Sequence, residues 1–410
     1  MANPLPTGSA VGIMGGGQLG RMIAMEARRL GYRTCVLDPD PRCPAAQVAD
    51  EHVRGGFGDL DAARALARRV HVATCEFENI PLHTVDAVDA IVPVHPGSAV
   101  LRIAQHRITE KETISGFGFP VPQFAALRCR DDLDRALGDM PLPLVMKTAT
   151  SGYDGKGQAV VHTRTEAADA FAELATQSPA LILEEFVDLA TELSVICARS
   201  VDGEVACYPV AENRHRAGIL DVTLVPARVS AAITRRAQEL AVGIVQRLSL
   251  VGLLAVELFL TRDGRLLVNE LAPRPHNSGH YTLDACPTSQ FEQLLRVLCQ
   301  LPLGAVDLHA PAAMANLLGD LWPSDVPMDC SPALAVAGVR LHLYGKAEAR
   351  AGRKMGHLCG LAPSVEKAWT QVLTARAAVD RQPLGRSDVN PPGGPDHSEC
   401  GQNGRGAQGR

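Results

Sequence analysis

Short apolar runs alternate with amphipathic stretches in the first quarter of the chain. The runs are typical of buried strands, and the stretches between them repeat their apolar residues every three to four positions, as helices do. The elements expected in the order strand, helix, strand, helix, strand lie at residues 11–14, 17–31, 33–38, 59–70 and 71–78. This order predicts a βαβαβ unit of a doubly wound, Rossmann-like sheet. A turn and one further helix are expected at 95–120.

The pattern changes in the middle of the chain. Strand-like runs with helical segments at 165–176 and 231–249 between them indicate an α+β region and not a second Rossmann half. The runs are PLVMKT, QAVVHT, ALILEEFV, TELSVICAR, EVACYPV and LLAVELFL. From residue 311 on, short strands and turns predict a small β-rich region. The tail at 385–410 is rich in Gly, Pro and polar side chains and is expected to be disordered.

The composition narrows the class of protein. A chain of 410 residues is expected to form about two to four domains, and 46% hydrophobic with 21% charged residues is an ordinary globular balance. The net charge of −5 gives no nucleic-acid footprint, and no apolar run approaches the ~18 residues of a membrane span. The N-terminus lacks a signal-peptide pattern, and the 11 cysteines include no C-x-x-C pair. These features predict a cytoplasmic protein with reduced thiols and with no nucleic-acid or membrane partner.

The stretch VGIMGGGQLG contains a glycine pattern with two interpretations. Gly15 to Gly20 spells G-x-G-x-x-G after a strand-like run, and Asp38 follows at the end of the next run. By spacing, this is a dinucleotide-binding fingerprint. A helix N-terminus preceded by glycines attracts any anion, however, so the same loop could hold the phosphate of a different molecule. The pattern by itself leaves both interpretations open.

A hairpin is predicted at GLLAVELFLTRDGRLLVNELAPRP, because Asp263-Gly264 between two apolar runs is a strong turn signal. With these two residues as the loop, counting back along both strands places Glu257 directly opposite Glu270. Two facing carboxylates repel unless a cation lies between them, and Mg²⁺ beside a nucleotide would provide one. Asn269 adds a neutral oxygen next to the pair. The alternative is a solvated hairpin edge with two unrelated glutamates.

Two further stretches have the composition of a nucleotide site. In VMKTATSGYDGKGQ, Lys147 ends a strand-like run, and a glycine-rich loop with Lys156 follows, which suits a phosphate. The loop is not a Walker A motif, and a plain hairpin turn is the alternative. In LILEEFVDLATELSV, backbone carbonyls at 184–187 and the carboxylate of Glu192 suit an adenine amine and a ribose. An ordinary strand connection is the simpler explanation of that segment.

The stretch APRPHNSGHYT follows Glu270 directly and is a candidate substrate loop. Its prolines make it rigid, and Arg274, His276 and Asn277 give it polar side chains beside the predicted cation. His276 and His280 have i, i+4 spacing, which would suit zinc on a helix. A proline and a glycine around them oppose a helix, and no H-E-x-x-H is present, so zinc is not expected.

Together, these motifs resemble the N5-carboxyaminoimidazole ribonucleotide synthetase family within the ATP-grasp superfamily. The segments that carry the resemblance, between about residues 10 and 380, are GGGQLGRM, CEFENIP, GYDGKGQ, VELF, NELAPRPHNSGH and LHLYGK…GRKMGH. Ser151 stands where these enzymes often have another glycine. The resemblance implies a mixed α/β and α+β fold. Its parts are a Rossmann-like domain (1–107), an ATP-grasp domain (108–310) with a small lid at about 117–188, a small C-terminal β-rich region (311–384) and the tail (385–410).

The resemblance also implies roles for individual residues. The ATP set is Arg107, Lys147, Gly152, Tyr153, Asp154, Gly155, Lys156, Gly157, Gln158, Glu184, Glu185, Phe186, Val187, Glu192, His215, Asn269 and Glu270. The Mg²⁺ ligands are Glu257 and Glu270, in agreement with the hairpin. The set for 5-aminoimidazole ribonucleotide and bicarbonate is Gln18, Leu19, Glu76, Tyr153, Asp154, Arg274, His276, Asn277, Lys346, Arg353 and Lys354. Without the family, the last three would be interpreted as a solvated basic run.

The activity implied is the ATP- and bicarbonate-dependent carboxylation of 5-aminoimidazole ribonucleotide in purine biosynthesis, through carboxyphosphate, with release of ADP and phosphate. Lys147 and Arg274 would offset developing charge, and Asp154 would orient the attacking amine or take its proton. The glycine loop would then face the ribonucleotide and bind no NAD. A homodimer is the family expectation. The alternatives are a formate-dependent glycinamide ribonucleotide transformylase, a biotin carboxylase, an NAD-binding oxidoreductase and a non-catalytic nucleotide-binding regulator.

Overall fold

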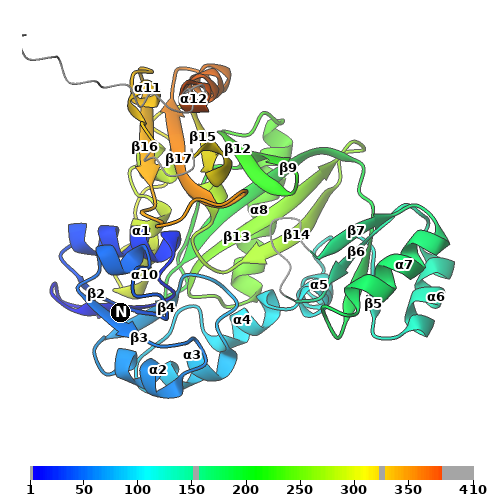
Figure 1. The fold of residues 1–410 in the computed structure, drawn as a ribbon, viewed down its shortest axis with the longest axis horizontal. Coiled ribbons are helices and arrows are strands. Elements are labelled where there is room, and N and C mark those ends of the chain that lie inside the picture. The colour runs from blue at the N-terminus through cyan, green and yellow to red at the C-terminus, as the bar shows by residue number, and fades with distance from the viewer. Residues whose placement is uncertain (1–2, 151–156, 323–327, 381–410) are drawn as a thin grey trace, which may run out of the picture.

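The computed structural model describes residues 3–150, 157–322 and 328–380, which form three β-sheets with helices packed around them (Figure 1). None of the helices in these ranges is long and apolar enough to cross a membrane. Several predicted features lie outside the described residues, namely Ser151, Gly152, Tyr153, Asp154, Gly155, Lys156 and the tail at 385–410.

The first sheet is parallel and has the strand order β3-β2-β1-β4. Helix α1 covers one of its faces, and α2 and α3 cover the other. The elements are β1 (Ala10–Met14), α1 (Gln18–Arg29), β2 (Arg33–Asp38), η1 (Ala45–Gln47), β3 (Glu51–Arg54), α2 (Leu60–Ala67), β4 (Val72–Cys75) and α3 (Leu82–Asp89). The five predicted elements are all present. The edge strand β3 was not predicted, because its sequence EHVR has no apolar run.

Two helices, α4 (Ser98–Ala104) and α5 (Arg107–Gly116), stand where one was expected, and they lead into the second sheet. This sheet is antiparallel, with the order β5-β8-β6-β7, and α6 and α7 pack their apolar residues against it. In Figure 1 it stands apart from the large sheet, at the right. The elements are β5 (Phe124–Leu127), α6 (Arg130–Asp139), β6 (Leu144–Thr148), β7 (Gln158–Val161), α7 (Arg164–Leu174) and β8 (Leu181–Glu185).

The third sheet is large and antiparallel, with the order β14-β13-β9-β11-β12-β15-β17-β16 and with β10 beside β9. Its central elements are β9 (Leu189–Arg199), β10 (Val205–Cys207), β11 (Ala211–Arg216), β12 (Ile219–Val225), α8 (Ala231–Arg247), β13 (Gly252–Thr261), β14 (Leu266–Ala272), η2 (Asn277–Gly279), α9 (Thr282–Ala285) and α10 (Gln290–Leu298). Alternate side chains of β9 and β13 face opposite ways, so α8 packs on one face and α10 on the other. Helix α10 also packs against α1, which joins the large sheet to the first sheet.

The C-terminal strands continue the large sheet and do not form a sheet of their own. β15 (Ala312–Leu318) pairs with β12, and β17 (Lys354–Leu361) and β16 (Val339–Leu343) extend the sheet to its edge. The remaining elements are η3 (Gly319–Leu321), α11 (Ser331–Leu334) and α12 (Val365–Asp380). Helix α12, which was not predicted, covers these strands and buries Val372 and Ala375 against them.

Candidate active site

A cavity of about 410 Å³ lies where α1, α5, the small sheet and the large sheet meet. Its walls contain many of the residues predicted from the sequence: Gln18, Leu19, Arg107, Lys147, Gln158, Glu192, His215, Glu257, Asn269, Glu270, Arg274, His276, Asn277 and Lys354. They also contain residues that were not predicted: Glu78, Leu189, Gly218, Leu220, Phe259 and Ala272. The described residues that were predicted but do not line the cavity are Glu76, Gly157, Glu184, Glu185, Phe186, Val187, Lys346 and Arg353.

Glu257 and Glu270 are paired across β13 and β14, as the sequence predicted. The predicted two-residue loop was wrong, because the Thr261 N–H donates to the Arg265 carbonyl (2.9 Å) and closes a three-residue loop in which Gly264 has a φ of +85°. That loop shifts the register by one residue. Between Glu257 and Leu258 the ladder has an irregularity, and Asn269 is the extra residue on β14 that restores the pairing of the two glutamates.

The oxygen atoms around this pair fit a Mg²⁺ ion. Asn269 Oδ1 is buried and accepts no hydrogen bond from the residues described, although an amide oxygen in such a position normally has a partner. No three His, Cys, Asp or Glu side chains of the described ranges gather as a metal-binding cluster. A cation here would therefore have two carboxylates and Asn269 as protein ligands, and it would complete its shell with other oxygens, as Mg²⁺ does beside a nucleotide.

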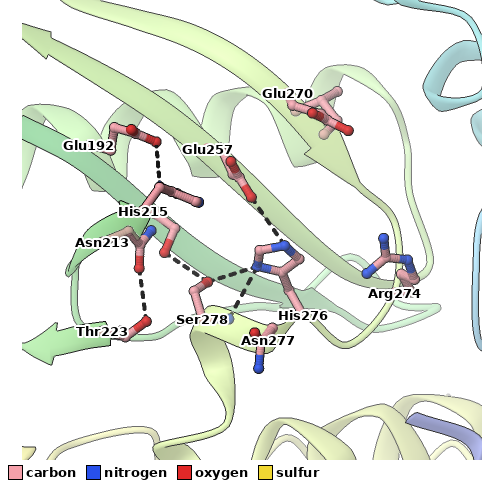
Figure 2. A network of polar contacts seen from close by, with 12 residues as sticks. Glu192, Asn213, His215, Thr223, Glu257, Glu270, Arg274, His276, Asn277 and Ser278 are labelled. Carbon is pink, nitrogen blue, oxygen red and sulfur yellow. Dashed lines mark hydrogen bonds and ion pairs between the residues drawn. The ribbon is translucent and has the colours of Figure 1, made fainter. Parts of the chain in front are cut away.

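A histidine and two arginines surround the carboxylate pair. His276 Nε2 lies 3.1 Å from Glu257 Oε1 (Figure 2). Arg107 Nη1 lies 3.3 Å from Glu270 Oε2. Burial alone would raise the pKa of Glu257, but the hydrogen bond from His276 and the charges of His276, His215 and Arg274 outweigh it and lower that pKa to about 2. Glu257 is therefore an anion over the whole range in which the protein would work.

Arg274 is held by Glu78, a residue that the sequence did not reveal. Both the Nε and Nη2 atoms of Arg274 donate to the Glu78 carboxylate, the latter at 3.1 Å. Burial opposes ionisation of Glu78, but the charge and hydrogen bonds of Arg274 lower the pKa of Glu78 below its ordinary value. Glu78 follows β4 and Arg274 follows β14, so this two-bonded ion pair joins the first sheet to the large sheet at the cavity wall.

Lys147 is fixed from behind by a buried charge cluster. Its Nζ lies 2.6 Å from Glu184 Oε2, and Lys111 Nζ lies 3.7 Å from the other oxygen of Glu184. Lys111 in turn donates to the carbonyls of Val268 (3.0 Å) and Asn269 (2.6 Å). Glu184 therefore supports the cavity without lining it, and Lys111 ties α5 to the strand that carries the metal-binding candidates. In the sequence, Lys111 lies in the charged run RITEKE, which gives no sign of burial.

The glycine loop of the first sheet uses its N–H groups inside the protein. The Gly17 and Gly20 N–H groups donate to the Glu76 carboxylate, each at 2.5 Å, and the Gly16 N–H donates to Asp38 (2.7 Å). Asp38 also accepts from the Asp40 N–H (2.8 Å) and is buried. The N–H groups of the glycine loop and the Asp38 carboxylate are therefore already used in hydrogen bonds within the protein. In an NAD site these groups would bind the dinucleotide, so their use here disfavours NAD. Gln18 and Leu19, at the start of α1, are the part of this motif that faces the cavity.

Only part of the predicted basic run reaches the cavity. Lys346 Nζ donates to Gln18 Oε1 (2.7 Å) and to the Lys354 carbonyl (2.5 Å), so it joins the C-terminal region to α1. The side chain of Lys354 lines the cavity. Arg353 instead donates to the Glu348 carbonyl (2.8 Å) and lies away from the lining.

On the large sheet, His215 on β11 lies beside Glu192 on β9, with 2.9 Å between Nδ1 and Oε2 (Figure 2). Burial lowers the pKa of His215, but the adjacent carboxylate of Glu192 outweighs it and raises that pKa above its ordinary value. In the substrate loop, Asn277 is at the wall, and its amide makes a reciprocal pair with buried Asn316 (3.1 and 2.6 Å).

The chain is similar to known proteins over most of its length. The ribonucleotide synthetase preATP-grasp domain family matches residues 9–105, the ATP-grasp domain family matches residues 112–291, and the phosphoribosylaminoimidazole carboxylase C-terminal domain family matches residues 312–371. The N5-carboxyaminoimidazole ribonucleotide synthase of Bacillus subtilis is 45% identical over 367 residues, which cover 90% of this chain and 95% of that protein.

Solved structures agree with these relatives. An N5-carboxyaminoimidazole synthase from Aspergillus clavatus, in complex with ADP and 5-aminoimidazole ribonucleotide, has a TM-score of 0.85 at 33% identity and covers 92% of this chain and 100% of its own. An N5-carboxyaminoimidazole synthetase from Staphylococcus aureus, complexed with ADP, has a TM-score of 0.85 at 34% identity and covers 91% and 98% of the two chains.

Proposed function

Because this chain belongs to the family of N5-carboxyaminoimidazole ribonucleotide synthases, we propose that it carboxylates the amine of 5-aminoimidazole ribonucleotide. The reaction consumes ATP and bicarbonate and releases ADP and phosphate. One observation on this chain carries the proposal. The Glu257–Glu270 pair with its buried Asn269 oxygen opens into the same cavity as Gln18 and Lys354, so a metal–nucleotide end and a basic substrate end share one space.

The nucleotide end of the cavity suits MgATP. Glu257, Glu270 and Asn269 would hold Mg²⁺, which supplies neutralisation of phosphate charge when it is bound. Lys147, which Glu184 holds in place, adds a positive charge for the phosphates. Arg107 beside Glu270, and His215 with Glu192, form the rest of the ATP site in this proposal.

For the reaction itself, the protein mainly has to align the substrates, and no covalent intermediate with a side chain is needed. The γ-phosphoryl group passes from ATP to a bicarbonate oxygen, which gives ADP and carboxyphosphate. Carboxyphosphate loses phosphate and leaves CO₂, and the exocyclic amine of the ribonucleotide attacks CO₂ and gives up one proton. Arg274 and His276 lie beside the carboxylate pair and would hold the bicarbonate. Our candidate for the group that orients the amine or accepts its proton is Asp154.

The test is ADP release by the full chain with ATP and Mg²⁺. We expect release to require both 5-aminoimidazole ribonucleotide and bicarbonate. Release with glycinamide ribonucleotide and formate instead would overturn the proposal in favour of the transformylase. Glu270→Gln is the control for a contaminating ATPase, because it should remove the signal.

Two properties of the family resemblance complete the proposal, namely a homodimer and a cytoplasmic location. Sedimentation equilibrium of the full chain at micromolar concentration measures the first, and a mass of one chain would contradict it. Fractionation of cells that express the chain measures the second.

A further inference from the structure

A fully buried glutamine lies behind the cavity, at the first residue of α10. The side chain of Gln290 is 0% exposed, and its amide pairs with the backbone of His276 through two hydrogen bonds. The His276 N–H donates to Gln290 Oε1 (2.9 Å), and Gln290 Nε2 donates to the His276 carbonyl (2.8 Å). Nε2 also lies 3.1 Å from Nδ1 of buried His280. Because one backbone partner is a donor and the other an acceptor, the amide can have only one orientation.

The backbone clamp sets the position from which the His276 ring reaches Glu257. Nε2 of the ring lies 3.1 Å from Glu257 Oε1. On the other side, Nδ1 accepts from the Ser278 N–H (3.3 Å) and lies 2.8 Å from the Ser278 hydroxyl (Figure 2). In the neutral ring, Nδ1 accepts from Ser278, so Nε2 is the nitrogen that carries the proton toward Glu257. The ring is thus held at both nitrogens, and its backbone is held by Gln290.

Gln290 is itself fixed by its surroundings. Its N–H donates to Thr282 Oγ1 (2.9 Å), whose hydroxyl donates to the Gly279 carbonyl (2.6 Å). A Cβ at Gly279 would lie only 2.5 Å from Gln290 Oε1, so the loop can approach this closely only because residue 279 is glycine. Phe291 and Leu295 anchor the helix in the core that α1 and the large sheet share.

From these contacts we propose that Gln290 is a positioning residue for the carboxylation reaction. It holds the backbone of His276 so that the imidazole stays on Glu257, and it thereby sets the geometry at the end of the cavity where Mg²⁺ and bicarbonate would meet. The reaction named here rests on the proposed function, whereas the placement of His276 by Gln290 rests on the contacts alone.

The same helix provides a matched control. Gln293 is also 0% exposed, and its amide clamps a backbone in the same way. Its Nε2 donates to the Gly304 carbonyl (3.0 Å), and the Gly304 N–H donates to its Oε1 (2.8 Å). Neither Gln293 nor Gly304 lines the cavity. Replacement of either glutamine by leucine removes a two-bond backbone clamp from the same helix, and Gln290→Leu also removes the contact with His280. Only Gln290 clamps a residue of the cavity wall.

The experiment compares Gln290→Leu with Gln293→Leu. We expect both variants to lower the unfolding midpoint by similar amounts. At saturating substrates, Gln290→Leu should lower kcat by roughly 10- to 100-fold, because the reacting groups are misplaced, whereas Gln293→Leu should keep kcat within about twofold. The KM for ATP should stay within about threefold in both. The double variant Gln290→Leu/His276→Ala should be no slower than His276→Ala, because Gln290 acts through His276.

Equal kcat values in Gln290→Leu and Gln293→Leu, or additive losses in the double variant, would overturn the proposal. Failure of the proposed function is distinguishable from this, because it would show as absence of bicarbonate-dependent ADP release in the wild-type chain. In that case, ¹⁵N NMR signals of the His276 ring test whether Gln290 positions this residue. These signals are assigned by their loss in His276→Ala. They should shift in Gln290→Leu and stay in Gln293→Leu, and any other pattern would contradict the clamp.

Discussion

Glu257 and Glu270 face each other across β13 and β14 because two one-residue irregularities cancel. The hairpin loop has three residues, which shifts the register by one, and Asn269 bulges from β14, which shifts it back. Asn269 lines the same cavity as the two glutamates, and its buried amide oxygen accepts no hydrogen bond from the residues that the structure describes. One extra residue therefore restores the carboxylate pair and adds a third oxygen to it.

The first prediction concerns Glu270. Replacement by Gln keeps the shape of the side chain and removes one charge from the candidate Mg²⁺ site. We expect ADP formation to fall by about a hundredfold or more, while the circular dichroism spectrum and the unfolding midpoint stay close to those of the wild type.

The matched control for Glu270→Gln is Asp263→Asn at the exposed loop of the same hairpin, which removes a charge outside the cavity. It should leave ADP formation within about twofold of the wild-type rate, as surface changes usually do. Wild-type turnover of Glu270→Gln at ordinary Mg²⁺ concentrations would refute the metal assignment.

The second prediction concerns the amide oxygen of Asn269. Asn269→Ala keeps the residue count, so the glutamates stay paired, and it removes the side-chain amide that carries this oxygen. We expect the Mg²⁺ concentration for half-maximal activity to rise by roughly tenfold. Deletion of Asn269 should close the bulge and bring Glu270 directly after Val268, still opposite Glu257, so it should raise the required Mg²⁺ concentration by a similar factor. An unchanged Mg²⁺ titration in Asn269→Ala would contradict a role for this oxygen in metal binding.

The third prediction concerns the buried Glu184. Burial would raise its pKa, but the charges of Lys111 and Lys147 and the hydrogen bond of Lys147 lower it from 4.5 to about 2. Since the folded pKa is the lower one, the unfolded chain takes up the proton first as the pH falls. The resulting stabilisation, about 3 kcal/mol, is fully present above pH 4.5 and is lost progressively toward pH 2.

Urea unfolding at several pH values measures this linkage. The deficit in unfolding free energy of Glu184→Gln should be largest near pH 7 and should shrink as the pH falls below 4.5. Glu185→Gln, the next residue on the same strand, contributes only a distant surface pair with Arg265 (4.0 Å) and should show no such trend. A deficit for Glu184→Gln that did not change with pH would contradict the charge cluster.

Local patterns in the sequence predicted those parts of the fold that depend on contacts between residues close together in the chain. The βαβαβ unit followed from periodicity, and the Glu257–Glu270 pair followed from a turn signal. The pair was predicted correctly although the predicted loop was one residue too short, because the bulge at Asn269 cancels that error. The bulge itself was not predicted, because a pattern of apolar residues does not reveal it. Strands with polar sequences, such as β3 and β11, were missed for the same reason.

Contacts between segments far apart in the chain could not be predicted from such patterns. Glu78 meets Arg274 across 196 residues, and Lys111 reaches Val268 across 157. In the sequence each looks like an ordinary surface charge, and only the packing of α5 and β4 against the large sheet shows that they are buried partners. Gln290 is a further example, since nothing in QFEQLLRVL distinguishes it from Gln293.

The last prediction returns to the glycine loop. A Cβ at Gly17 would lie 2.4 Å from Glu76 Oε1, the atom that accepts the Gly17 N–H. Gly17→Val should therefore displace the Glu76 carboxylate and move the neighbouring Gln18 and Leu19, which line the cavity. We expect the KM for 5-aminoimidazole ribonucleotide to rise by about tenfold or more, with little change in the KM for ATP, since Lys147 and Glu270 lie on other elements.

The control for Gly17→Val is Gly56→Ala in the same domain, where a Cβ would meet no atom within 4 Å and the kinetic constants should not change. If the KM for ATP rose and that for the ribonucleotide did not, the loop would belong to the nucleotide end of the cavity. If the wild-type chain bound NAD and Gly17→Val did not, the dinucleotide interpretation would return. Since the loop N–H groups are already donated to Glu76 and Asp38, we expect neither result in steady-state kinetics or in a nicotinamide fluorescence titration.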